Sequence, residues 1–346
     1  MKLGISIGFG GSAKFELPMQ RVLRAEELGF DSVWSAETYG SDAMSPLAYI
    51  AALTKKIRLG TGIVQLAART PTNLAMSAQT IDALAGGDRM IIGLGVSGPQ
   101  IVEGWYGQPW GKPNARLRDA VAIVKKVLRR EGPVVHDGKE ISLPYKGPGS
   151  SGLAKPLKSI MHGNPNIPVF LGTSTPVNVR MTAEVADGWI GMHLAPDSLK
   201  KKYLPIIQEG LAKRTDGKTL KDFEIRTSVG VQIASDVNQA LSAMKPMVAL
   251  FVGGMGAKDK NFHKDAMVDR GYPQAAQRIQ ELFLAGRKDE AAAAVPDEYL
   301  DDENLIGPPA RIAERWKRWQ DSGITMMCFT SASDEVVELM GKVARQ

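Results

Sequence analysis

Leu59-Gly-Thr-Gly-Ile-Val-Gln65 is the first of two stretches from which the fold of this chain can be predicted. The second follows about 25 residues later and is Met90-Ile-Ile-Gly-Leu-Gly-Val-Ser-Gly98. Each begins as a short apolar run and ends in a turn rich in glycine. Residues 73–84, which lie between them, follow a helical pattern. Glycine at a strand end lets a flat ligand or an anion approach the backbone closely. These two neighbouring strand ends therefore predict the bed of a cofactor.

The same alternation of strand and helix continues along the chain. Eight strands are predicted, at residues 3–7, 31–35, 57–60, 90–94, 169–172, 188–191, 223–233 and 324–330. Short apolar strands joined by helices are typical of a parallel sheet buried on both faces. Eight such units favour a closed (β/α)₈ TIM barrel over an open sheet.

Two segments do not follow the alternation of strands and helices, and they are expected to be insertions into one domain that spans residues 1–346. Residues 131–167 come before the fifth strand, and their Asp137-Gly138 pair predicts a hairpin turn. Residues 252–308 come before the eighth strand and include an acidic stretch, 297–303, which is expected to be a turn. In the regular part, Ser45 is expected to cap the second helix.

Composition narrows the kind of partner. Charged residues make up 23% of the 346 and the formal net charge is +6, which suits a small anionic ligand better than a nucleic-acid groove. No apolar stretch approaches the roughly 20 residues that cross a bilayer, and the first residues predict a strand and not a signal peptide. We therefore expect a cytoplasmic protein with a small-molecule substrate. Cys328 is the single cysteine of the sequence, so an internal disulfide is excluded. It is expected to be a buried thiol on a strand.

Familiar site motifs do not fit. Gly93-Leu-Gly-Val-Ser-Gly98 matches the glycine fingerprint of dinucleotide folds, but residues 103–110 read as a loop, and no acidic residue ends a following strand. The four histidines, His136, His162, His193 and His263, are scattered, so no metal site is expected. Gly172-Thr-Ser-Thr-Pro176 opens a helix and can cradle an anion, although it can equally be an ordinary helix cap.

Several motifs resemble the luciferase-like oxidoreductases over nearly the whole chain. They are Leu59–Ile63, Ala83–Arg89 with Gly93–Gly95, Ala183–Trp189 and Ile306–Pro308. Two further stretches, Ala36–Asp42 and Val96–Gly107, resemble an actinobacterial subgroup that uses the deazaflavin coenzyme F420.

The resemblance implies a barrel, usually a homodimer, that holds a flavin-like ring at its strand ends. It implies a non-proline cis peptide at Gly62-Ile63 beneath the ring and a cofactor phosphate over Gly172–Thr175. Two departures argue against the chemistry of the sugar-phosphate branch. This chain has Glu37-Thr38 where relatives often have Asp-His, and Gly98-Pro99 where that branch has a glutamate.

The predicted function is hydride transfer between F420 and a small organic substrate. The alternatives are an FMN-dependent monooxygenase of the same superfamily and a non-catalytic F420-binding barrel. The strand ends and the resemblance assign to the cofactor Phe9, Gly10, Ala36, Glu37, Thr61, Gly62, Ile63, Gly95, Val96, Ser97, Gly98, Gly172, Thr173, Ser174, Thr175 and Met192.

Catalytic and substrate roles rest on fewer residues. Glu37, with Thr38 beside it, is the candidate proton handler, and a structural carboxylate is the alternative. The substrate pocket is assigned Trp105, Tyr106 and His193. Lys258, Lys260 and His263 of the second insertion could close over substrate, but a solvated surface is favoured for them.

Overall fold

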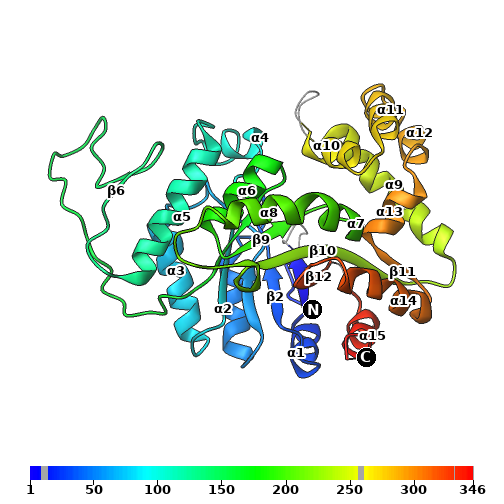
Figure 1. Cartoon of the computed structure of the whole chain (residues 1–346), viewed down its shortest axis with the longest axis horizontal. Coiled ribbons are helices and arrows are strands. Elements are labelled where there is room, and N and C mark those ends of the chain that lie inside the picture. The colour runs from blue at the N-terminus through cyan, green and yellow to red at the C-terminus, as the bar shows by residue number, and fades with distance from the viewer. Residues whose placement is uncertain (9–14, 256–260, 331, 346) are drawn as a thin grey trace.

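The computed structural model describes residues 1–8, 15–255, 261–330 and 332–345. In this part of the chain, eight parallel strands close into a barrel (Figure 1). They are β1 (Lys2–Gly8), β2 (Ser32–Ser35), β3 (Arg58–Thr61), β5 (Met90–Gly95), β8 (Val169–Gly172), β9 (Gly188–Gly191), β10 (Glu224–Ile233) and β12 (Met326–Thr330). The long strand β10 pairs with both β9 and β12 and so closes the ring. The predicted barrel is confirmed.

Helices surround the barrel, and one of them covers the helical pattern predicted at residues 73–84. They are α1 (Met19–Glu27), α2 (Met44–Leu53), α3 (Pro71–Leu84), α5 (Pro113–Arg129), α6 (Pro176–Val185), α7 (Pro196–Ser198), α8 (Leu204–Leu211), α14 (Pro309–Gln320) and α15 (Asp334–Val343), with a π-helical turn at Leu199–Tyr203 and a 3₁₀ turn at Leu220–Asp222. The predicted cap of α2 is wrong. Asp42 Oδ1 accepts the N–H groups of both Met44 and Ser45, at 2.8 and 2.9 Å, so Ser45 lies inside the helix.

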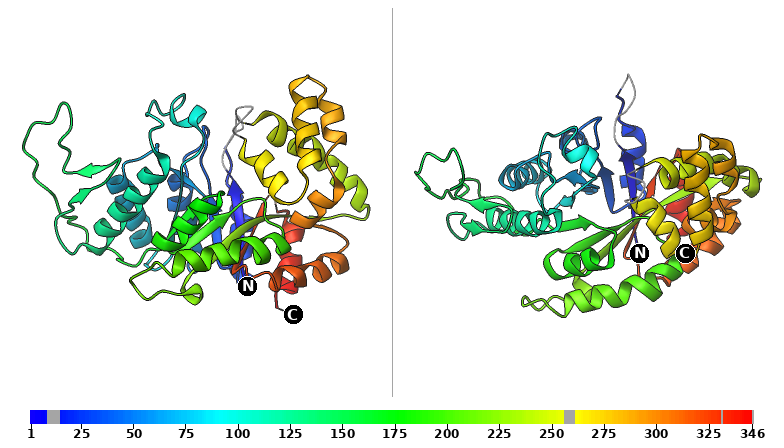
Figure 2. Two further views of the ribbon diagram at one scale, coloured as in Figure 1. Left: turned by 45° about the horizontal axis from the view of Figure 1, so that its top comes forward. Right: turned by 90° about the horizontal axis from the view of Figure 1, so that it is seen from above.

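The two insertions lie at opposite ends of the molecule (Figures 1 and 2). The first contains the predicted hairpin, formed by β6 (His136–Asp137) and β7 (Ser142–Leu143). The second contains α10 (Phe262–Asp269), α11 (Pro273–Leu284), α12 (Lys288–Ala293), α13 (Asp297–Glu303) and β11 (Leu305–Gly307), and α9 (Val237–Gly254), which begins before residue 252, shares their apolar core. The acidic stretch is therefore the helix α13 and not a turn. Its Tyr299 and Leu300 are buried in an apolar core that belongs to the insertion, and this packing outweighs the charge of the acidic residues.

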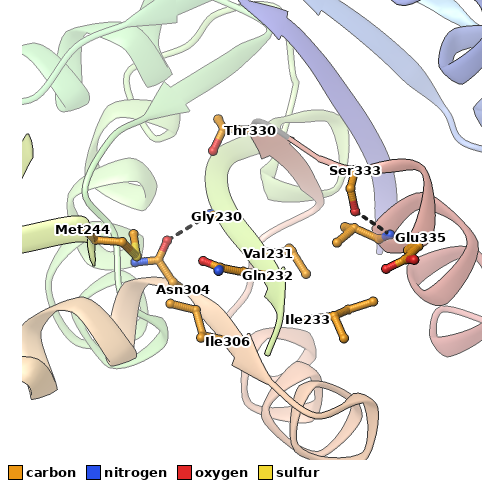
Figure 3. A pocket seen from close by; sticks show the side chains of 11 residues that line it. Gly230, Val231, Gln232, Ile233, Met244, Asn304, Ile306, Thr330, Ser333 and Glu335 are labelled. Atoms are coloured by element: carbon orange, nitrogen blue, oxygen red, sulfur yellow. Dashed lines mark hydrogen bonds between the residues drawn. The ribbon is translucent and has the colours of Figure 1, made fainter. Parts of the chain in front are cut away.

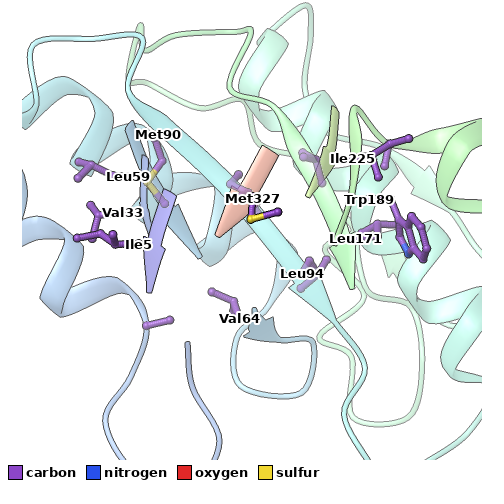
Figure 4. Close-up of a cluster of buried hydrophobic side chains, with 14 of the residues drawn as sticks. Ile5, Val33, Leu59, Val64, Met90, Leu94, Leu171, Trp189, Ile225 and Met327 are labelled. Carbon is purple, nitrogen blue, oxygen red and sulfur yellow. The ribbon is translucent and has the colours of Figure 1, made fainter. Parts of the chain in front are cut away.

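Both faces of the barrel strands are buried. Outward-facing side chains such as Ile5, Val33 and Leu59 belong to the large cluster shared with the helices (Figure 4). A smaller cluster that includes Trp34 and Cys328 is buried separately from it. Cys328 is a buried free thiol on β12, as predicted, and its burial raises the pKa of the thiol. Among the described helices, none has the length and apolar character needed to span a membrane.

Candidate functional site

The barrel topology brings most of the predicted cofactor residues to one face. Parallel strands end together, and the ends of β2, β3, β5, β8 and β9 follow one another around the ring. The residues after these ends are therefore neighbours, as a (β/α)₈ site requires. Phe9 and Gly10 lie outside the described residues, as do Lys258 and Lys260.

The Gly62-Ile63 peptide is cis, as the resemblance implied. The side chain of Ile63 lies across the ends of the next two strands of the barrel. A Cβ added at Gly95 would be 3.0 Å from Ile63 Cδ1, and one added at Gly172 would be 2.9 Å from Ile63 Cγ2. These glycines therefore make room for the isoleucine, not directly for a ligand as the sequence suggested. Ile63 thereby forms an apolar surface over two strand ends.

Glu37 is held on all sides. Each of its two carboxylate oxygens accepts a hydrogen bond of 2.9 Å from Arg69 Nη1. The backbone N–H groups of Ala43 and Gln65 also donate to this carboxylate, at 3.0 and 2.9 Å. Only 5% of Glu37 is exposed. The carboxylate ties the loop after β2 to the short strand β4 (Val64–Gln65). These contacts favour the structural alternative over a proton-handling role.

The residues next to Glu37 line the same loop. The backbone oxygen of Thr38 accepts from Gln65 Nε2 at 3.1 Å and from the hydroxyl of Tyr106 at 3.3 Å. Burial, and then the nearby Glu37, raises the pKa of Tyr106. Trp105 is 61% exposed, and its ring lies 6.4 Å from that of Tyr39. Trp105 and Tyr106 follow the short helix α4 (Pro99–Val102), and Trp105 presents its ring to the surface.

Several predicted hydroxyls already have partners. Thr61 Oγ1 bonds both the N–H and the carbonyl of Gly93, at 2.8 Å each, and so links β3 to β5. Thr173 Oγ1 bonds Thr182 Oγ1 at 2.9 Å. Thr175 caps α6 by accepting the N–H of Asn178, which is the ordinary cap that the sequence left open.

The start of α6 nevertheless keeps the properties of an anion cradle. The first N–H groups of a helix have no partner within it, and the helix dipole is positive there. Ser174 and Thr175 are exposed at this point, directly after the end of β8. The neighbouring turn after β5 is equally open, since Ser97 is exposed and adopts a φ of 68°.

Two buried polar atoms beside this surface lack a hydrogen-bond partner within the described part of the chain. They are Ser35 Oγ, at the end of β2, and Gln65 Oε1, on β4. Buried polar groups are normally paired, so an ordered water is expected to satisfy these two atoms. The sequence offered no signal for either residue, because nothing local distinguishes them from core polar groups.

His193 follows β9 and joins the barrel to the second insertion. Its Nδ1 lies 2.9 Å from Glu303 Oε1, and its Nε2 lies 2.8 Å from His263 Nδ1. Glu303 also pairs with Arg270 at 2.7 Å. His263 is 7% exposed, so the solvated surface expected for it is wrong. The residue next to His193, Met192, is 45% exposed on the same face.

The charges of this cluster follow from its contacts. Burial opposes a charge on His193, but the Glu303 carboxylate raises the pKa of His193 above its ordinary value. Burial and the neighbouring His193 lower the pKa of His263 to about 3. The Glu303 carboxylate therefore favours the protonated form of His193, whereas His263 is uncharged near neutral pH. Both ring nitrogens of His193 face partners in the insertion, and 22% of its side chain remains exposed.

A cavity of about 350 Å³ opens beside the last strands (Figure 3). It reaches the end of β12 at Thr330 and is bounded by the outer part of β10, by β11 and by the first turn of α15. Asn304 Oδ1 accepts the N–H of Gly230 at 3.0 Å on its wall. The cavity lies at the side of the face that carries the predicted cofactor residues, and the sequence did not indicate it.

Comparison with known proteins finds a matching family and similar relatives over nearly the whole chain. The sequence profile described as luciferase-like monooxygenase matches residues 6–326. A Mycobacterium tuberculosis protein named "putative coenzyme F420-dependent oxidoreductase" is 44% identical over 338 residues, which cover 97% of each chain. A 5,10-methylenetetrahydromethanopterin reductase of Archaeoglobus fulgidus is 26% identical over 99% of this chain and 98% of its own.

A solved structure shares the fold. The coenzyme F420-dependent tetrahydromethanopterin reductase from Methanopyrus kandleri superposes with a TM-score of 0.77 at 23% identity. The match covers 99% of this chain and 97% of that one. The barrel and its insertions are thus an arrangement that solved proteins share.

Proposed function

Because this chain belongs to the luciferase-like monooxygenase family, we propose that it is a coenzyme F420-dependent oxidoreductase that passes a hydride between the deazaflavin and a small organic substrate. The relative at 44% identity, which spans 97% of both chains, carries an F420-dependent name. The methylenetetrahydromethanopterin reductases also align over nearly their whole length. Such complete coverage supports a shared cofactor more strongly than a shared substrate.

The observation that carries the proposal is the surface formed by Ile63 over Gly95 and Gly172. It lies next to the open start of α6, which follows the end of β8. A flat ring with a phosphate-bearing tail matches this apolar surface and the positive helix start beside it.

Each part of the chain then has a task. Ile63 supports the ring, and the first turn of α6 with Ser174 and Thr175 receives the phosphate. The deazaflavin, when bound, supplies the carbon that accepts or gives the hydride. The protein's contribution is to hold this carbon and the substrate at about 3–3.5 Å in the right orientation. Glu37 maintains the loop that borders the site.

Binding of the two candidate cofactors tests the proposal directly. Purified protein, titrated with F420 and separately with FMN while cofactor fluorescence is recorded, is expected to bind F420 in the micromolar range or tighter, about −8 kcal/mol. FMN is expected to bind at least tenfold more weakly. Retention of FMN with no measurable F420 affinity would instead support the FMN-dependent alternative. F420 binding without reduction of any of a broad panel of ketones, enones and imines would support a binding protein.

Gly172→Ala tests the proposed floor of the site. The new Cβ would lie 2.9 Å from Ile63 Cγ2, and because β-branched side chains are stiff, Ile63 has to move. We expect F420 affinity to fall about tenfold, equivalent to 1.4 kcal/mol, with little change in folding. The matched control is Gly132→Ala, because a Cβ there meets no atom within 4 Å. Equal affinity in the two variants would show that the cofactor does not rest on Ile63.

Subunit association stays a prediction. The resemblance implies a homodimer, and light scattering of the purified protein measures it. Substrate identity is best sought after the cofactor is bound, because the cofactor forms one wall of the space that remains.

A further inference from the structure

The side chains of His193 and His263 join the barrel to the helical insertion. His193 follows the end of β9, and its φ of 53° is a left-handed conformation that residues other than glycine seldom adopt. His263 is in the first turn of α10, in the second insertion (Figure 1). The two rings pack edge to face, with their centres 5.0 Å apart. This contact therefore places α10 against a strand end of the barrel.

Two hydrogen bonds connect three side chains at this contact. His193 Nδ1 lies 2.9 Å from Glu303 Oε1, and His193 Nε2 lies 2.8 Å from His263 Nδ1. An ionised carboxylate only accepts, so the hydrogen of the first bond is on His193. A neutral His193 has no second hydrogen, and His263 then has to donate at the other contact. A protonated His193 donates at both contacts, so the two bonds depend on the number of protons that the pair carries.

The surroundings of Glu303 favour one added proton on His193. Arg270 Nη1 donates to the other oxygen of Glu303 at 2.7 Å, and Arg270 is itself stacked on Tyr299, 3.9 Å from the centre of that ring. Burial opposes a charge on Glu303, but His193 and then Arg270 bring the pKa of Glu303 below its ordinary value. Burial likewise opposes a charge on His193, and the Glu303 carboxylate outweighs it and raises the pKa of His193.

His263 is placed where a charge of its own is costly. Its ring stacks on Phe251 of α9 at 4.9 Å and lies 4.2 Å from the ring of Phe262, and only 7% of the residue is exposed. Burial and the neighbouring His193 lower the pKa of His263 to about 3. Two charged imidazoles in contact would also repel each other. His263 is therefore suited to be the neutral acceptor of a bond from His193.

We infer that Glu303, His193 and His263 form a proton-dependent latch that holds helix α10 against the end of β9. With one added proton on His193, both hydrogen bonds are donated by a cation, and charge-assisted bonds are roughly twice as strong as neutral ones. Without that proton, a neutral ring donates to Glu303, and the bond to His263 has to reverse its direction. With a second proton, on His263, the second bond loses its acceptor. The latch therefore weakens on both sides of an intermediate pH.

The pH range of the latch follows from the two histidines. Because the pKa of His193 is raised, its contribution is present in full below the ordinary value of 6.5 and is lost as the pH rises through the folded-state pKa. Because the pKa of His263 is lowered, an open latch takes up a proton below 6.5 that the closed latch does not take up until about pH 3. The contact is therefore expected to be strongest near pH 6.5.

Other charged groups lie on the elements around the latch. Lys202 pairs with Asp269 of α10 at 2.7 Å, and their side chains are 30% and 42% exposed, so solvent screens this second contact with the barrel side. Burial and then Asp269 raise the pKa of Asp265, also on α10, so this carboxyl titrates on the acid side of the profile. Lys264 Nζ donates to side chains of α11 and not to the histidines. The alkaline side of the profile therefore reports on His193.

Hydrogen–deuterium exchange of α10 measures the latch. Exchange of a peptide that contains α10 is followed from about pH 5 to about pH 9 and corrected for the pH dependence of exchange in unstructured peptides. Protection in the wild type is expected to be highest near pH 6.5. On the alkaline side it is expected to fall about tenfold for each unit by which the pKa of His193 is raised. A peptide from the barrel helix α5 is the reference.

Three variants separate a latch from ordinary packing. His193→Gln keeps a donor for Glu303 but does not titrate, so the alkaline loss of protection is expected to disappear. His263→Phe keeps an aromatic ring beside Phe251 and removes the part of the acid loss that this histidine causes. His162→Gln, in the first insertion, is the matched control and is expected to keep the wild-type profile. Protection that is constant with pH, or an unchanged alkaline loss in His193→Gln, would overturn the inference.

Nitrogen-15 NMR of the imidazoles decides the question where a variant fails to fold. In the wild type, the His193 ring is expected to become neutral only above pH 6.5, while the His263 ring stays neutral down to about pH 5. Two rings that both titrate near 6.5 would contradict the latch. Neither measurement requires a bound cofactor, so the outcome does not depend on the proposed function.

Discussion

Gly93→Ala is expected to lower the free energy of unfolding by about 3 kcal/mol, the upper end of what overpacking costs in protein cores. A Cβ at Gly93 would lie 1.8 Å from the carbonyl oxygen of Thr61 and 2.8 Å from Ile190 Cδ1. The carbonyl belongs to β3, which pairs with the strand that carries Gly93. Thr61 Oγ1 fixes the separation further, because it bonds both backbone groups of Gly93. A backbone atom held in this way cannot turn aside as a side chain can.

Urea unfolding followed by circular dichroism measures this loss, and Gly132→Ala serves as the control. Both variants add one methyl group, but the one at residue 132 meets open space. We expect the control to lie within 0.5 kcal/mol of the wild type. A Gly93→Ala variant as stable as the control would mean that β3 moves away from β5 without breaking the barrel. That result would also show that the two strand ends are not rigidly spaced.

Arg69→Met is expected to cost about 3 kcal/mol, because it leaves the carboxylate of Glu37 buried and without its cation. The Glu37 side chain is 3% exposed and that of Arg69 is 17% exposed, so solvent screens the pair only slightly. Methionine retains most of the apolar volume of arginine, and the loss therefore reports on charge. Arg118→Met is the control. Its partner Glu184 is a surface residue, and exposed pairs contribute about 0–1 kcal/mol.

Unfolding stability and F420 affinity, measured together with turnover, distinguish the structural role of Glu37 from the proton-handling role. Glu37→Gln removes the ion pair but keeps a side chain that still accepts a hydrogen bond. If Glu37 only secures its loop, stability and F420 affinity are expected to fall together in Glu37→Gln and in Arg69→Met. If Glu37 handles protons, turnover is expected to fall in Glu37→Gln while stability and affinity stay near those of the wild type. A destabilised Arg69→Met with normal turnover would fit the structural role.

The sequence revealed the barrel because its strands and helices repeat with local signals. Apolar runs bounded by glycine, such as residues 90–94, identify strands without reference to distant residues. The predicted turn at 297–303 failed for the opposite reason. Its acidic residues suggest exposure, and only the packing of Tyr299 and Leu300 against other insertion helices makes it a helix.

The site was predictable in its place but not in its contacts. Strand ends in a barrel meet whatever the side chains are, so Ile63, Gly95 and Gly172 could be grouped from sequence alone. The partner of Glu37 lies 32 residues away, and that of His193 lies 110 residues away. Such pairings depend on the angles of loops and helices.

The helical insertion has its own apolar core, which includes Met267, Ile279 and Tyr299. It meets the barrel through β11 beside β10 and through the contact of His193 with Glu303. The parts that would hold the cofactor come from other strands and their loops. Apart from the His193 contact, substitutions in the insertion core are therefore separated from the strands proposed to hold the cofactor. In such a barrel, a lineage of duplicated genes can acquire new substrates by altering one module while the redox machinery is inherited unchanged.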